Sequence, residues 1–338
     1  MNLLTLTILL PLVGVLALAL APRENTKNIK LIALSSSVVT LISSLLMLTK
    51  YKFGVTGFQL VSSHNWFKVF NINYAVGIDG LALVLILLTT VLVPIVVVGG
   101  WNEAENGRWS VKTFYILILI LETFMVAVFA ATDVFLFYVI FEAMLIPVYF
   151  LIGGYGRGDR GAAALKFLLY SLFGGLLMLA AVIGIFVVSL RQGHASFDVT
   201  QLSHLKISHN TQNWLFLGFF IAFAIKAPLF PFHTWLPGAA RSATPGTSIL
   251  VLGVLDKVGT YGMIRFCLTL FPEATKTFCA VHHRARGYLH YLRSLPSHRS
   301  EGPQFADRLY LNLTLRIYCP WNLCAHQPRH HRCKFVHG

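Results

Sequence analysis

The chain has 338 residues, of which 56% are hydrophobic and 12% charged, and its mean hydropathy is +0.68. This composition excludes a water-soluble domain and indicates a membrane protein. The net charge of +14 would suggest an anionic partner, but residues 274–338 hold 10 Lys and Arg against 2 Asp and Glu, and so carry +8 of it. We therefore expect a lipid bilayer as the surroundings and no nucleic-acid partner.

Apolar stretches long enough to cross a bilayer recur along the chain and predict an all-α polytopic membrane protein with about eight transmembrane helices, the seventh broken. Residues 49–76 are expected to form an exposed loop with short strands, and residues 191–213 a polar loop. The predicted spans are residues 3–21, 31–48, 78–98, 113–131, 134–153, 164–190, 214–236 and 247–270.

Basic residues in the connections predict the orientation. The connections after the first, third, fifth and seventh spans hold nine Lys and Arg, whereas the alternate connections hold five. The positive-inside rule places the first set in the cytoplasm and the N-terminus outside. No basic region precedes the first span, so we do not expect a signal peptide there.

The stretch IAFAIKAPLFPFHTWLP, residues 221–237, interrupts the seventh span. Pro228 and Pro231 each remove a backbone donor, which predicts a break between Lys226 and Pro231. A break inside a membrane persists only where the freed carbonyls face protein or water. Lys226 lies beside the break, and an ionisable group at that depth predicts part of an ion path. The alternative is that Lys226 extends its ammonium to the membrane interface.

Four spans place a charge near their middle: Glu122, Glu142, Lys226 and Lys257. This pattern predicts a chain of proton-exchanging sites across the membrane plane. Static Glu–Lys pairs that only hold helices together are the alternative. Asp256 adjoins Lys257 but lies about 100° away around a helix, so the two are not expected to face the same neighbour.

His233 lies seven residues after Lys226, beyond the break. Imidazole exchanges protons readily near neutral pH, so His233 is a candidate proton relay, with a hydrogen-bonded structural histidine as the alternative. Pro147, five residues after Glu142, is expected to bend the fifth span. Residues 1–273 contain no metal-ligand spacing, phosphate loop or nucleophile triad.

Three motifs resemble a known family. FYVIFEAMLIPVYFLIGGYG (137–156), AFAIKAPLFPFHTWLPGAA (222–240) and GVLDKVGTYGMIRF (253–266) are similar, in order and spacing, to the M subunit of proton-translocating NADH:quinone oxidoreductase, respiratory complex I. The motifs are shared in looser form with the L and N subunits and with Mrp-type cation/proton antiporters. The resemblance covers roughly residues 1–273.

The resemblance implies a role in proton transfer. It matches Glu142, Lys226 and Lys257 to the family's proton-carrying half-channel and His233 to the family histidine after the break. It implies an enzyme only as a subunit, driven by quinone reduction elsewhere in the complex. NADH, flavin, iron–sulfur clusters and quinone would then belong to partner subunits, with no cofactor in this chain. The other membrane-arm subunits would be the partners, and the bacterial cytoplasmic membrane the location.

Two departures from the family lead to other expectations. The family has about fourteen helices in two inverted repeats, and here the resemblance ends after the eighth, so residues 1–273 are expected to form a truncated, antiporter-like proton-translocating domain. Gly238 stands where the family usually has an acidic residue. A cation/proton antiporter subunit and a non-functional truncated fragment remain the alternative functions.

Residues 274–338 are expected to form a basic, disordered tail. Their sudden gain in Arg, His, Pro and Cys is typical of a shifted reading frame. A native tail and a zinc site are the alternatives, because Cys319, Cys324 and Cys333 lie near His326, His330 and His331.

Overall fold

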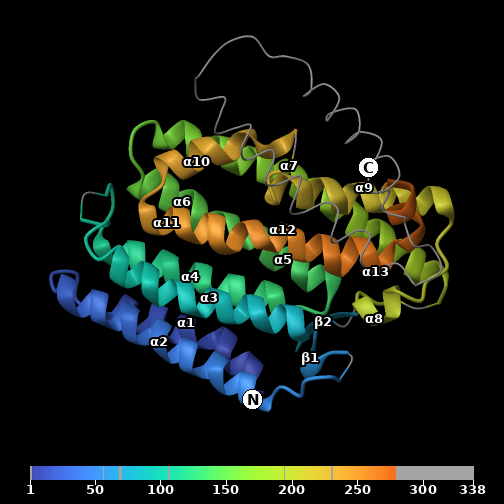
Figure 1. Ribbon diagram of the computed structural model, residues 1–338, viewed down its shortest axis with the longest axis horizontal. Helices are drawn as coiled ribbons and strands as arrows, with labels where there is room; N and C mark the ends of the chain where they lie inside the picture. Colours follow the sequence, from blue (N-terminus) through green and yellow to red (C-terminus); the bar gives the residue numbers. More distant parts are fainter. Residues whose placement is uncertain are drawn as a thin grey trace, which may run out of the picture.

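The computed structural model describes residues 2–55, 57–67, 71–105, 107–193, 195–229 and 231–278. Within them, long helices lie side by side, and a two-stranded hairpin and the short helix α8 lie at one end (Figure 1). All but the first five residues of the predicted tail lie outside the described residues, as do the cysteines and histidines of the zinc alternative. The predictions for the tail therefore stay predictions.

The elements follow the predicted order of spans. The first half contains α1 (Leu3–Leu20), α2 (Thr26–Lys50), β1 (Gln59–Phe67), β2 (Ile72–Ile78), α3 (Gly80–Gly99), α4 (Val111–Ala130), α5 (Val134–Ala143) and α6 (Leu145–Tyr155). The second half contains α7 (Arg160–Arg191), α8 (Val199–Leu202), α9 (His209–Lys226), the 3₁₀ turn η2 (Phe232–Trp235), α10 (Leu236–Ser242), α11 (Pro245–Leu250), η3 (Val251–Leu255), α12 (Asp256–Gly262), η4 (Met263–Cys267) and α13 (Leu268–Leu270).

Seven of the eight predicted spans are helical segments long and apolar enough to cross a membrane. The remaining span is the predicted seventh, in which α9 ends at Lys226 and the chain resumes helical structure at Phe232. The structure therefore confirms the all-α polytopic class and the broken seventh span. It also shows short strands in the second connection, where β1 and β2 pair antiparallel.

Several helices begin earlier than hydropathy predicts. α2 begins at Thr26, where the side chain of Asn25 accepts a hydrogen bond from the N–H of Asn28. α9 begins at His209, five residues before the apolar stretch. Hydropathy identifies only the part of a helix that lies in the hydrocarbon, whereas the helix continues through polar residues to its cap.

Connections that the sequence assigns to the same side meet at the same end of the bundle. At the hairpin end, Val76 of β2 bridges to Ala131 and Asp133 bridges to Asp198. At the opposite end, the N–H of Gly246 donates to the Glu103 carboxylate at 3.0 and 3.1 Å. These contacts support the predicted alternation of the spans. They do not test which end faces the cytoplasm, which stays a prediction.

Two further spans are locally irregular. The fifth span is divided at Met144, which separates α5 from α6. Pro147 explains the division, because it has no N–H for the carbonyl four residues earlier. The last span contains two π-helical turns, η3 and η4, on either side of α12. π-helical turns of this kind occur frequently at functional sites.

Candidate functional site

The break in the seventh span supplies its own hydrogen-bond partners. After α9 ends at Lys226, the N–H of Leu229 still reaches the carbonyl of Ala224 at 2.8 Å. The carbonyl of Ile225 accepts a hydrogen bond of 2.8 Å from the indole Nε1 of Trp235 in η2. A freed carbonyl therefore faces protein, as a break within a membrane requires.

Lys226 is buried at the end of α9, with only 1% of its surface exposed. Its Nζ lies 4.6 Å from the centroid of the Phe141 ring and 6.0 Å from that of Phe167. The C-terminal end of a helix and the faces of aromatic rings both favour a cation. The ammonium has no hydrogen-bond partner among the described residues. The alternative in which Lys226 extends to the membrane interface does not fit this burial.

Glu142 lies in α5 and interacts electrostatically with Lys226. Its carboxyl group is accommodated by Gly175 of α7, since a Cβ at that position would lie 2.0 Å from Glu142 Oε1. The absence of a side chain at position 175 therefore makes room for the carboxyl group. The structure brings Glu142 and Lys226 into one buried site formed by α5, α7 and the end of α9.

The last span approaches this site closely at Gly259. A Cβ at Gly259 would lie 2.7 Å from the backbone nitrogen of Ala227, the residue that follows Lys226. Because Gly259 is only two residues after Lys257, the two lysines lie on neighbouring elements at similar depth. The glycine permits this approach, which a larger residue would prevent.

Lys257 pairs with the residue that precedes it in the sequence. Its Nζ forms an ion pair with Asp256 Oδ2 at 3.0 Å. The long lysine side chain can fold back along the helix surface to reach Asp256, although the two Cβ positions are about 100° apart around the helix. The side chain of Lys257 is 33% exposed.

Glu122 lies in α4 with none of its surface exposed, and neither carboxyl oxygen has a hydrogen-bond partner among the described residues. Glu142 Oε1 and Lys226 Nζ likewise have none there. Static Glu–Lys pairs would need close contacts between these charges. The alternative of fixed pairs is therefore not favoured for Glu122, Glu142 and Lys226.

His233 lies in η2, beyond the break, and is half-buried. The break places Lys226 and His233 on separate helical pieces, as the sequence predicts. A role for His233 in proton relay stays a prediction. Gly238, the departure from the family pattern, is exposed in α10 with open space around its Cα.

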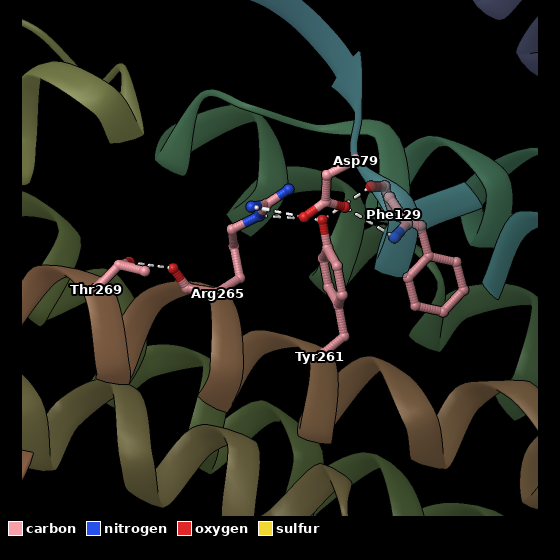
Figure 2. A network of polar contacts seen from close by, with 6 residues as sticks. Asp79, Phe129, Tyr261, Arg265 and Thr269 are labelled. Atoms are coloured by element: carbon pink, nitrogen blue, oxygen red, sulfur yellow. Dashed lines mark hydrogen bonds and ion pairs between the residues drawn. The ribbon is translucent and has the colours of Figure 1, made fainter. Parts of the chain in front are cut away.

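The sequence interpretation missed a network that ties the last span to the hairpin end (Figure 2). Arg265 pairs with Asp79 Oδ2 at 3.2 Å, and its Nε donates to the Tyr261 hydroxyl at 3.3 Å. That hydroxyl donates to the carbonyl of Phe129 at 2.9 Å, and the guanidinium lies 4.3 Å from the centroid of the Phe58 ring. The arginine inside the predicted eighth span is the feature of the sequence that could have indicated this network. Its partner Asp79 lies near the start of the predicted third span.

Two family profiles match adjoining parts of the chain. The profile described as "NADH-ubiquinone oxidoreductase chain 4, amino terminus" matches residues 5–128. The profile described as "NADH:quinone oxidoreductase/Mrp antiporter, TM" matches residues 131–282. Together they cover all the elements of the candidate site.

Curated relatives show the same similarity. The chain is 43% identical to NADH-quinone oxidoreductase subunit M of Mycobacterium tuberculosis, over 80% of this chain and 55% of the relative. It is 38% identical to NADH-ubiquinone oxidoreductase chain 4 of Chondrus crispus, over 82% and 55%. It is 36% identical to subunit M of Rhodobacter capsulatus, also over 82% and 55%. The chain thus spans about half the length of the curated relatives it matches.

Solved structures share the arrangement of helices. A chain of respiratory complex I from Thermus thermophilus superposes with a TM-score of 0.71 and 30% sequence identity, over 82% of this chain and 55% of that chain. A chain of the Mrp complex from Dietzia sp. superposes with a TM-score of 0.61 at 19% identity, over 81% and 29%. Because the sequence identity of the second match is low, that match shows a shared fold only.

Proposed function

Because the chain belongs to the family of NADH-quinone oxidoreductase subunit M and its chain 4 counterparts, we propose that it carries protons through the membrane arm of such a complex. Glu142, Lys226 and Lys257 are the proposed proton carriers, and His233 is the proposed relay beyond the break. Electron transfer from NADH to quinone takes place in other subunits. The chain is thus part of an enzyme without holding a redox centre of its own.

One observation carries this proposal: Lys226 is buried at a helix break, and its Nζ lies 4.6 Å from the ring centroid of Phe141, the residue next to Glu142. A buried charge of this kind is costly in a membrane. Two opposite charges that interact without a fixed hydrogen bond can change partners when a proton arrives or leaves. A purely structural pair would instead be held by close hydrogen bonds.

We infer the partners and the location of the chain from its family. The partners are the other membrane-arm subunits and the lipid bilayer, and the location is a bacterial cell membrane that the chain crosses several times. NADH, flavin, iron–sulfur clusters and quinone are assigned to the partner subunits. This chain is proposed to bind none of them.

A cation/proton antiporter subunit is the second candidate, favoured by the Mrp name in the profile that matches residues 131–282. The two functions differ in what drives the protons. A complex I subunit needs NADH and quinone, whereas an antiporter needs a gradient of a second cation.

The test is a chimera in which residues 5–282 replace the matching segment of subunit M in the Rhodobacter capsulatus enzyme. We expect the chimera to co-purify with the redox subunits and to acidify membrane vesicles when NADH is added. Acidification driven by a sodium gradient without NADH would instead support the antiporter. Failure to associate with the redox subunits, despite insertion into the membrane, would overturn the proposed assembly.

A further inference from the structure

Glu122 is a buried acid without a partner in the described part of the chain. The elements packed most closely against α4 are α1, α2, α3, α5, α6, α12 and β2. Of these, α1 and α3 contain no ionisable side chain. The others contribute the ionisable groups Lys27, Lys30, Lys50, Tyr74, Tyr138, Glu142, Tyr149, Tyr155, Asp256, Lys257 and Tyr261.

Glu122 and Glu142 lie at the same depth. α4 and α5 pack against each other as an antiparallel pair, and Thr132 lies in the turn between them. Each glutamate is ten residues from Thr132, which corresponds to about 15 Å along a helix. Glu122 therefore belongs to the same layer of the membrane domain as the buried site around Glu142.

Glu122 lies on the side of α4 that carries Phe129. It lies seven residues before Phe129, and positions seven apart share a helix face. The Phe129 ring contacts that of Tyr261 in α12, with centroids 5.3 Å apart. α4 and α12 run in the same direction, so Glu122 is level with Val254 and within one turn of Lys257.

An ionised carboxylate is not stable in these surroundings. Without a cation or hydrogen-bond donor, a fully buried carboxyl group takes up a proton instead of remaining charged. The resulting acid still has an O–H to donate and a carbonyl oxygen to accept. No described side chain meets either need, so exchange of the Glu122 proton would require a water molecule as donor and acceptor.

We propose that Glu122 is a further proton-binding side chain of this layer, which exchanges its proton with water on the side of Lys257. In the exchange, the carboxyl O–H bond breaks as the proton joins a water molecule and forms hydronium, and the carboxylate afterwards takes a proton from hydronium, which becomes water again. This inference rests on the proposed function, which it extends from α5, α9 and α12 to α4.

Infrared spectroscopy of the purified full chain in lipid vesicles tests the proposal without requiring the complex. Spectra are taken at about pH 8, where Asp133 is ionised, although burial raises its pKa to about 6. The variants are Glu122→Gln, Glu122→Asp, Glu142→Gln and, as a control on the adjacent residue, Thr123→Val.

We expect a carbonyl band of a protonated carboxylic acid that is lost in Glu122→Gln, is retained in Glu142→Gln and Thr123→Val, and shifts promptly in D₂O. Glu122→Asp should show such a band at an altered frequency, which keeps the test valid if Glu122→Gln fails to fold. An unchanged band in folded Glu122→Gln, no acid band in Glu122→Asp, or a band that does not shift in D₂O would overturn the proposal.

This outcome is distinguishable from failure of the proposed function. The infrared band reports only the protonation and exchange of Glu122. The chimera reports NADH-driven transport and assembly. If the chimera does not acidify vesicles but the infrared band behaves as expected, the proposed proton transport is wrong and the proposal for Glu122 stands.

Discussion

The carboxyl group of Glu142 in α5 occupies the space that a side chain at Gly175 of α7 would need: a Cβ there would lie 2.0 Å from Oε1 and 2.2 Å from Cδ of Glu142. The glycine therefore positions a charge that lies on another helix. In the proposed function, this carboxyl group must stay where it can interact with Lys226.

Gly175→Ala is expected to displace the Glu142 carboxyl group and to lower NADH-driven proton translocation in the chimera by about an order of magnitude or more, because small misplacements of a reacting group are costly. Gly161→Ala, in the same helix but with open space around it, is the matched control and should translocate normally. Translocation by Gly175→Ala at the rate of Gly161→Ala would contradict this account of the site.

Trp235→Phe should destabilise the chain by about 1–3 kcal/mol, because it leaves the carbonyl of Ile225 buried without its donor. The measurement is thermal unfolding in detergent, followed by circular dichroism. Trp214→Phe is the control, since Trp214 is 73% exposed. Equal unfolding temperatures for the two variants would show that the indole N–H is not needed at the break.

The burial of Asp133 leads us to expect that the stability of the folded chain depends on pH. Its Oδ1 accepts the N–H of Leu136 at the start of α5, and burial, the largest cause, raises its pKa to about 6. A pKa raised above the unfolded value of about 3.9 means that folding favours the protonated acid. The stabilisation is fully present below about pH 4 and is lost as the pH rises through about 6.

Asp133→Asn removes this ionisation while keeping a side chain that can cap α5. Its unfolding temperature, relative to that of the wild type, should therefore rise by a few degrees between about pH 4 and pH 7.5. Asp159→Asn, at an exposed position before α7, is the control and should show no such trend. A parallel pH dependence of Asp133→Asn and the wild type would refute the assignment.

Arg265 and Asp79 should be energetically coupled, because their ion pair joins the last span to the start of α3. A double-mutant cycle with Arg265→Lys and Asp79→Asn is expected to give a coupling energy of about 0.5–3 kcal/mol in unfolding. Lysine keeps the charge but loses the planar group that also covers Phe58. Additive effects of the two substitutions would mean that the pair does not hold these elements together.

The sequence was sufficient to predict the spans, because a bilayer requires about 20 apolar residues and the prolines at 228 and 231 interrupt one such run. It did not predict where α2 and α9 begin. Their first turns are polar, and hydropathy does not distinguish a polar helix end from a loop. The division of the fifth span at Met144 was anticipated from Pro147 only as a bend.

The charged residues of the site could be predicted from the sequence, but the residues that pack around them could not. Glu142 and Lys226 stand out because ionisable residues are rare in apolar runs. Gly175, Phe141 and Trp235 are ordinary residues for a membrane helix, and only the packing of distant elements makes them part of the site. The Asp256–Lys257 ion pair was not predicted either, because a rule on helix faces does not describe how far a flexible lysine side chain reaches.

In the proposed function, protons cross this layer through Glu142 and Lys226. The most direct measurement is the number of protons translocated per NADH oxidised in vesicles carrying the chimera, with Lys226→Ala, Glu142→Ala and the exposed control Lys206→Ala. We predict that both site variants assemble and lose most proton translocation, while Lys206→Ala keeps the wild-type ratio. A wild-type ratio in either Lys226→Ala or Glu142→Ala would contradict the account.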